Sequence, residues 1–350
     1  MHLKVKEHRL LLEIRQQPEA IIETLRQENE EFQNVSKFVR NGTCFLGMGS
    51  SFYASLYAKY LLREVGSLDV AVELTSEFLH YPPKIRRGQV FVLISQSGES
   101  VETVKVGRFL KRHQATVIAV TNQPDSSLAK LSRCTLLTHA GEERASATKT
   151  FTSTLALLHR IVYFAGRREG RVSSGRLADS YDRLVSCANS MRREMPRWEQ
   201  HIKRMVDHAT TCRSIIVLGR GYNLVPALQG ALLFKEVVKI PAEGMSAGEF
   251  MHGPIEMASP ELQAIVLTGG ATSSLMTGLV TRLEKYHATV LTIGPEAAGT
   301  ASTIGFKEKE QTLIPFPSIV ALDLLVYFTA LKRRLNPDRF GHISKVTLVE

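Results

Sequence analysis

The sequence predicts an α/β protein built from two copies of one unit, each a mainly parallel sheet with helices on both faces. Two observations lead to this prediction. Short runs rich in β-branched residues alternate with helical stretches, which is typical of parallel sheets covered on both sides. The same order of segments then returns about 172 residues later. With 350 residues and ordinary globular composition, the chain has room for two domains, and composition excludes disordered, collagen-like and coiled-coil classes.

The expected elements follow one another along the chain. Residues 1–30 form a helical segment, in which Pro18 and Glu19 suit a helix start. The first unit covers 31–170, the helical linker 171–202, the second unit 203–335 and the tail 336–350. Strands of the first unit are expected at 43–49, 70–74, 90–95 and 116–122, and strands of the second at 214–221, 264–270 and 288–294.

The repeat can be checked position by position. Gly47 and Gly219, Glu64 and Glu236, and His80 and His252 are all separated by 172 residues. Ala115-Thr116-Val117 returns at 288–290, with a spacing of 173. Matching residues at so many positions favour a duplicated unit. Common ancestry alone can then explain a matching Glu or His in both copies.

Charge and cysteine usage limit the classes of partner and compartment. The formal charge of +10 suits an anionic ligand, nucleic acid or simply a basic protein, and no recognition-helix pattern favours nucleic acid. No run reaches 18 apolar residues and the N-terminus lacks a signal-peptide core, so no membrane span or secretion is expected. The scattered cysteines show no CxxC spacing and indicate a reducing, cytoplasmic setting without a zinc site: Cys44, Cys134, Cys187 and Cys212.

A serine-rich loop follows the third expected strand of the first copy. Hydroxyls and backbone N–H groups at the carboxyl end of a parallel strand, before a helix, can hold a phosphate. A plain serine helix cap is the alternative. After the first strand, Ser50 and Ser51 can add two further hydroxyls. The loop residues are Ser95, Gln96, Ser97, Gly98, Glu99 and Ser100.

The second copy carries the candidate proton-transfer groups. Glu236 lies near the end of an apolar helix, and His252 follows in the segment AGEFMHGP. A carboxylate and an imidazole can move protons beside a carbonyl. The alternatives are a surface helix charge for Glu236 and a hydrogen-bonded structural histidine for His252. Lys345 in the tail can form an imine with a sugar carbonyl, or it can be an ordinary solvated lysine.

Taken together, the motifs resemble a known family. The series LLEIRQQPEAI, GMGSSFYA, SQSGES, SATK, LFKE, SAGEFMHGP and ISKVTLVE occurs in this order over about residues 10–350. It resembles the tandem sugar-isomerase (SIS) domains of glucosamine-6-phosphate synthase. The same branch holds aminosugar-phosphate deaminases and fructosamine-phosphate deglycases.

This resemblance implies roles for individual residues. It implies that Glu236 shuttles a proton between C1 and C2, that His252 assists ring opening, and that Lys345 meets the sugar carbonyl. In the family the histidine enters the site from the neighbouring subunit, which implies at least a homodimer. Moving a bound proton needs no metal and no organic cofactor, so we expect none. The phosphate-binding set that the resemblance implies is Ser50, Ser95, Ser97 and Ser100, with Gln96 in the same loop.

Departures from the synthase pattern shape the expected activity. The glutamine-hydrolysing domain is missing, so release of an amine is expected rather than its addition. Positions that surround the sugar in the synthase differ here, being Ala147, Gln229, Leu233 and Pro241. We therefore expect an enzyme that isomerises an aminosugar or sugar-amine 6-phosphate and releases the amine, with a small-molecule sugar phosphate as its partner. The alternatives are simple aldose–ketose isomerisation and a non-catalytic sugar-phosphate sensor.

Overall fold

The computed structural model describes residues 7–27, 29–211, 213–295, 302–339 and 341. Contacts divide the chain into two compact units. The first unit contains residues 19–142 and 149–186. The described part of the second unit contains residues 7–18, 143–148, 187–339 and 341, with the gaps given above. A unit defined by contacts therefore draws on separate stretches of sequence.

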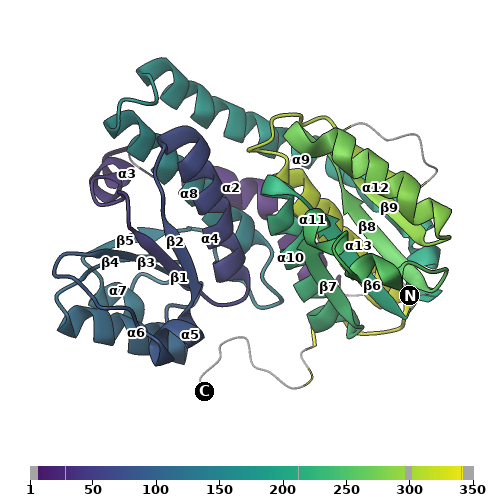
Figure 1. Cartoon of the computed structure of the whole chain (residues 1–350), viewed down its shortest axis with the longest axis horizontal. Coiled ribbons are helices and arrows are strands. Elements are labelled where there is room, and N and C mark those ends of the chain that lie inside the picture. The colour runs from purple at the N-terminus through teal and green to yellow at the C-terminus, as the bar shows by residue number, and fades with distance from the viewer. Residues whose placement is uncertain (1–6, 28, 212, 296–301, 340, 342–350) are drawn as a thin grey trace, which may run out of the picture. The chain divides into compact units, whose positions relative to one another are not determined.

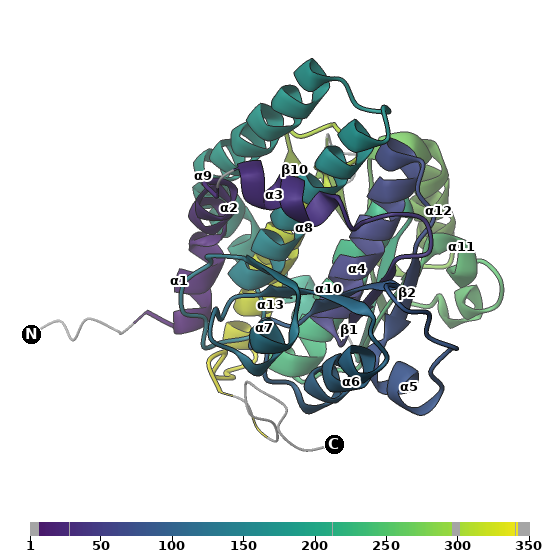
Figure 2. The same ribbon diagram turned by 90° about the vertical axis from the view of Figure 1, so that its left-hand side faces the viewer.

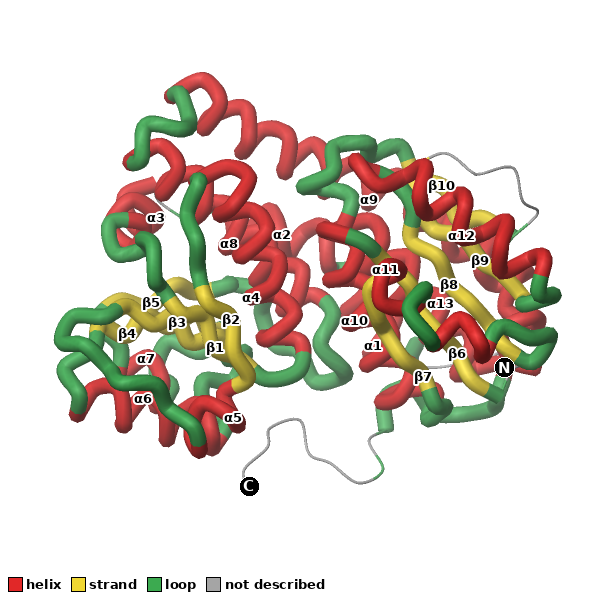
Figure 3. The backbone as a smooth tube through the Cα atoms, in the orientation of Figure 1, coloured by secondary structure: helices red, strands yellow, loops and turns green. Residues whose placement is uncertain are grey.

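The first unit is built on a five-stranded sheet of order β2-β1-β3-β4-β5, in which all paired strands are parallel (Figure 3). Three of its five strands, β1, β3 and β4, are largely buried and mostly apolar, as expected for a sheet covered on both faces. The strands are β1 (Cys44–Gly47), β2 (Ala71–Leu74), β3 (Val90–Ile94), β4 (Thr116–Thr121) and β5 (Cys134–Leu137).

Helices cover both faces of this sheet (Figures 1 and 2). On one face, Phe78, Val106, Leu110 and Leu128 form a core with the apolar strand side chains. They come from α5 (Thr75–His80), α6 (Val101–Arg112) and α7 (Ser127–Leu131). On the other face lie α4 (Ser50–Leu61), α8 (Lys149–Arg168) and α3 (Asn29–Ser36), which pack on one another.

The second unit repeats this architecture. Its five parallel strands have the order β10-β9-β8-β6-β7, which is the order of the first sheet in the second copy. α11 (Ala247–Phe250) and α12 (Ser273–Lys285) supply one core, while α10 (Leu224–Leu233) and α13 (Pro315–Lys332) pack together. The strands are β6 (Ser214–Gly219), β7 (Ala242–Ser246), β8 (Leu262–Leu267), β9 (Thr289–Pro295) and β10 (Thr303–Phe306). The predicted α/β fold with two parallel sheets is thus confirmed.

The remaining helices are α1 (Arg9–Arg15), α2 (Gln17–Leu25) and the 38-residue α9 (Ser174–Thr211). α9 continues beyond residue 202, where the sequence analysis ended the helical linker. One helix, α13, is long and apolar enough to cross a membrane, but 83% of it is buried inside the protein. It is therefore a helix of the protein core.

Candidate functional site

Two loops of the first unit meet at the point where its strand order reverses. The strand that follows β1 in the chain lies on one side of the β1–β3 pair, and the strand that follows β3 lies on the other. The loops that follow β1 and β3 therefore lie next to each other at the carboxyl edge of the sheet, where ligands bind in such folds. The first loop leads into α4 at Ser50, and the second, residues 95–100, leads into α6 at Val101. Both helix N-termini therefore lie at this edge, where unpaired backbone N–H groups favour an anion.

Serine hydroxyls organise the second loop from within. The buried Ser95 Oγ accepts a hydrogen bond from the Gly98 amide at 3.1 Å and lies 3.3 Å from Ser100 Oγ. Ser97 Oγ accepts from the Glu99 amide at 3.2 Å. A hydroxyl that accepts a hydrogen bond keeps its own proton as a donor. The loop can therefore present hydroxyl donors to a bound anion.

Ser100 bears on whether this loop is a plain serine helix cap or a phosphate-binding loop. It occupies the N-cap position of α6, yet its side chain makes no capping hydrogen bond. Its contact is with Ser95 inside the loop. Ser100 therefore does not act as a side-chain cap of α6 in this structure, and phosphate binding by the loop stays a prediction.

Gly98 is required by the shape of the loop. Its φ is +64°, and a Cβ at this position would lie 2.2 Å from Ser126 Oγ and 2.5 Å from Ser126 Cβ. The loop is also tied to its surroundings, because Gln96 O accepts from the Asn122 amide at 3.0 Å. Glu99 accepts from the Ser127 amide at 2.7 Å, and this bond lowers the pKa of Glu99. These anchors hold the loop in one shape before any ligand arrives.

Ser50 and Ser51 form the first turn of α4, and both are half-buried. The turn before them depends on Gly47, since a Cβ there would lie 2.6 Å from the carbonyl carbon of Ser51. Gly49 adopts φ +49°. The predicted phosphate residues of the two loops thus follow strands that are direct neighbours in the sheet.

The second unit keeps the backbone of these loops but only some of their hydroxyls. Gly221 and Gly270, which match Gly49 and Gly98, also have positive φ values, +59° and +70°. The positions that match Ser95 and Ser97 are Leu267 and Gly269. Thr272 matches Ser100, so of the three loop serines of the first unit the described second unit keeps a hydroxyl at one position.

Glu236 lies on a π-helical turn. The turn η3 (Phe234–Val238) follows α10 and ends at Lys239 with φ +57°. The first unit has the same turn at η1 (Leu62–Gly66), so the duplication extends to an irregular feature that is frequent at functional sites. Glu236 is half-buried, whereas its counterpart Glu64 is exposed. Glu236 is thus less exposed than its counterpart, while the choice between a proton-transfer group and a surface helix charge stays open.

His252 directly follows the segment that contains α11. Its backbone N–H donates to Glu249 O at 2.9 Å, and its side chain is exposed. Within the part of the chain that the structure describes, the imidazole has no hydrogen-bond partner. The alternative of a histidine held by structural hydrogen bonds therefore has no support among the described residues, and the role of His252 stays a prediction.

The predicted residues divide between the units. The serine loop and Ser50 belong to the first unit, and Glu236 and His252 belong to the second. Lys345 lies outside the described residues. Among the described residues, no group of three His, Cys, Asp or Glu side chains is arranged to hold a metal ion.

Two of the departures from the synthase pattern contact each other. Gln229 Nε2 donates to the Ala147 carbonyl at 2.9 Å, and Gln229 is buried. The backbone near Ala147 is held further by Glu13, which accepts from the amides of Arg144 and Ala145 at 2.7 and 3.0 Å. Residues 82 positions apart gave no sequence signal for this contact. Of the other two departures, Leu233 is buried and Pro241 is exposed.

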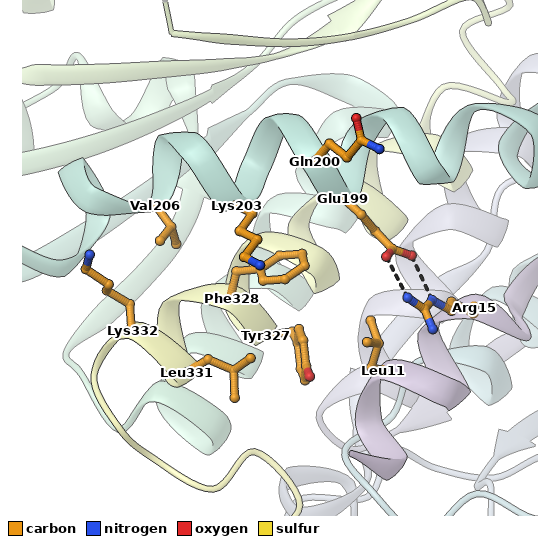
Figure 4. Close-up of a pocket in the computed structure, with 10 residues that line it drawn as sticks. All are labelled: Leu11, Arg15, Glu199, Gln200, Lys203, Val206, Tyr327, Phe328, Leu331 and Lys332. Carbon is orange, nitrogen blue, oxygen red and sulfur yellow. Dashed lines mark hydrogen bonds and ion pairs between the residues drawn. The ribbon is translucent and has the colours of Figure 1, made fainter. Parts of the chain in front are cut away.

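A hollow of about 650 Å³ in the second unit lies elsewhere (Figure 4). It is lined by α1, α9 and α13, and none of the predicted site residues lines it. Arg15 faces Glu199 across its edge, with hydrogen bonds of 2.8 and 2.7 Å. Its apolar floor carries Tyr327, Phe328 and Leu331. This hollow has no arrangement of reactive groups like that of the serine loop.

Comparisons with known proteins agree on one family. A family model described as SIS domain matches residues 41–163 and 210–304, together more than half of the chain. The isomerising glutamine–fructose-6-phosphate aminotransferase of Thermococcus kodakarensis is 28% identical over 351 residues. That match covers 98% of this chain but only 58% of the relative, so the chain spans less than two thirds of its length.

Solved structures share the fold over nearly the whole chain. The C-terminal domain of glucosamine-fructose-6-phosphate aminotransferase from Francisella tularensis superposes with a TM-score of 0.89 and 22% identity, covering 96% of this chain and 99% of that one. Glucosamine-6-phosphate deaminase from Thermotoga maritima superposes with a TM-score of 0.78 and 22% identity, covering 97% and 99%. At these identities the structures establish the fold.

Proposed function

The chain belongs to the SIS domain family, and from this premise we propose that it isomerises an aminosugar or sugar-amine 6-phosphate between aldose and ketose forms and releases the amine. The remaining product is a hexose 6-phosphate. We also propose that the enzyme acts in the cytoplasm, at least as a homodimer. The unpaired Cys44, Cys134 and Cys187 are compatible with a reducing compartment.

The observation that carries the proposal is the serine loop. Its hydroxyls gather at the carboxyl edge of the first sheet, beside the N-terminus of α6, and Ser100 leaves that helix uncapped. A phosphate placed here would accept hydrogen bonds from hydroxyls and from the helix amides.

The proposed chemistry moves one proton. His252 assists opening of the sugar ring, and Glu236 removes a proton from C2 and returns it to C1, or the reverse. Starting from an aldose with an amine at C2, this step gives a C2 imine. Starting from a ketose with a substituted amine at C1, it gives a C1 imine. Addition of one water to either imine releases the amine and leaves the hexose carbonyl.

The positions of Glu236 and His252 support these roles. A half-buried carboxylate on a π-helical turn is fixed more firmly than one on a solvated face, which suits a base that must be oriented. The exposed imidazole of His252 suits the family arrangement in which it serves a neighbouring subunit. Lys345 would meet the open-chain carbonyl, as the resemblance implies.

The test is product analysis with a panel of substrates. Purified protein is incubated with glucosamine 6-phosphate, fructoselysine 6-phosphate, glucoselysine 6-phosphate, fructose 6-phosphate or glucose 6-phosphate, and amines and hexose phosphates are followed by mass spectrometry. We expect equal amounts of amine and hexose 6-phosphate from at least one of the first three. Interconversion of the hexose phosphates without amine release would replace the proposal with simple isomerisation. Binding without any product would replace it with a sensor.

A further inference from the structure

The first unit has a hollow of its own, at the edge of its sheet opposite to the serine loop. It has a volume of about 520 Å³ and is formed by the segments that precede β1 and β3. Four of its lining residues are cationic, namely Arg40, Lys84, Arg86 and Arg87, and none of its lining residues is acidic. All four cations are exposed. The amino ends of the same two strands whose carboxyl ends carry the serine loops therefore border a basic hollow.

The charges in this hollow have no acidic partner among the residues that the structure describes. Lys84, Arg86 and Arg87 form no ion pair with any residue that the structure describes. Elsewhere in the same unit, cations do find acids: Arg63 pairs with Asp69 at 2.8 Å. Arg40 donates from Nη2 to Gly88 O at 3.0 Å, which orients its guanidinium without supplying a negative charge. The hollow thus keeps an excess of positive charge.

Helix C-termini at this edge offer one ordinary explanation, because cations complement the negative end of a helix dipole. The duplicated fold tests that explanation. The second unit has the same strand order, and its residues 253–261 match residues 81–89 at the spacing of 172. Residues 81–89 carry three cations and no acid, whereas residues 253–261 carry Glu256 and Glu261 and no cation. The topology therefore does not demand positive charge here.

We propose that this basic hollow, formed by Arg40, Lys84, Arg86 and Arg87, binds a small soluble ligand with two or more linked phosphate groups. Guanidinium and ammonium groups are the side chains that pair best with phosphate oxygens. Four positive charges exceed what one phosphate monoester, with a charge of roughly −1.5 to −2, needs. A hollow of this volume falls within the range of about 300–1,000 Å³ for small-molecule sites. This site is separate from the proposed sugar-phosphate site and does not depend on the proposed reaction.

The test measures binding of inorganic pyrophosphate by calorimetry, with orthophosphate as the single-phosphate comparison. The S97A/S100A variant removes hydroxyls of the serine loop, and we expect its pyrophosphate binding to persist. In the K84Q/R86Q/R87Q variant we expect the Kd to rise at least about tenfold, because charge-assisted bonds to phosphate are lost. The control R171Q/R176Q/R193Q changes the net charge equally at three exposed cations without ion pairs among described residues. Its Kd should stay within about twofold of the wild type.

Four results would overturn the proposal. The first is unchanged pyrophosphate binding in K84Q/R86Q/R87Q, and the second is equal weakening in the control variant. The third is equally tight binding of orthophosphate, which would indicate a single-phosphate site. The fourth is binding of a short RNA oligonucleotide that K84Q/R86Q/R87Q abolishes while the wild type binds no pyrophosphate. Circular dichroism of each variant confirms that these exposed substitutions leave the fold intact.

Discussion

Replacing Gly98 by alanine should damage both the stability of the first unit and its phosphate site. Alanine in the left-handed region costs roughly 1–2 kcal/mol. The added Cβ would also lie 2.5 Å from Ser126 Cβ, which is bonded to the backbone and cannot rotate away. Overpacking of this kind adds roughly 1–3 kcal/mol. We therefore expect G98A to lower the free energy of unfolding by about 2–5 kcal/mol.

The assay is urea unfolding of matched variants, combined with calorimetric binding of a sugar phosphate. Gly170 provides the control, because its φ is +70° and no heavy atom lies within 4 Å of its ideal Cβ. G170A should therefore lose only the conformational part, about 1–2 kcal/mol, and bind the sugar phosphate normally. In G98A/S126G the clashing atoms are gone, and part of the lost stability should return. Equal losses in G98A and G170A, or unchanged phosphate binding in G98A, would refute the reasoning.

Three further predictions concern histidines and a buried amide. H252N should lower kcat on a cyclic substrate by roughly 10²–10⁴-fold, because ring opening loses its proton donor and acceptor. The control H80N, in the first copy, should leave kcat unchanged. Equal effects of the two substitutions would contradict the role assigned to His252. Q229L removes the donor to the Ala147 carbonyl and should lower the free energy of unfolding in urea by about 1–3 kcal/mol. Unchanged stability would mean that the bond is dispensable. Burial lowers the pKa of His159 from 6.5 to about 3. Between these two pH values the unfolded chain binds a proton at this residue that the folded chain does not bind. The free energy of unfolding should therefore fall as the pH decreases from 6.5 toward 3. Thermal melts should show a flatter pH dependence in H159N, and an unchanged profile would contradict this cause.

Much of the fold was predictable because it depends on local patterns. The buried strands β3, β4 and β8 consist mostly of apolar residues, and each overlaps a segment where the sequence analysis expected a strand. The turn glycines Gly49 and Gly98 were visible as breaks between strand and helix. Their positive φ values explain why glycine occurs at these positions.

Other features left no local signal. β5 and β10 are four-residue edge strands with mixed burial, and the sequence analysis named neither. The π-helical turns η1 and η3 interrupt segments that read as ordinary helix, since the extra residue per turn depends on packing. In the sequence, the repeat of Glu64 as Glu236 showed only that the two segments correspond.

Contacts over long sequence distances could not be predicted at all. Gln229 and Ala147 were each noted as departures, but their hydrogen bond follows from the folded arrangement of α10 and residues 143–148. The basic hollow likewise joins Arg40 to a loop more than 40 residues later. A single sequence shows which residue types are present, but it does not show which of them come into contact in the folded chain.

The most direct test of the central claim compares wild type and E236Q with the preferred amine-bearing sugar phosphate, using E64Q as the matched control from the first copy. Ammonium or amine, hexose 6-phosphate and binding of the substrate are measured together. The account predicts equal amounts of amine and hexose phosphate from wild type and E64Q. It predicts a roughly 10²–10⁴-fold loss of both products in E236Q, with substrate binding retained. Full activity of E236Q, or hexose phosphate formed by wild type without amine, would contradict it.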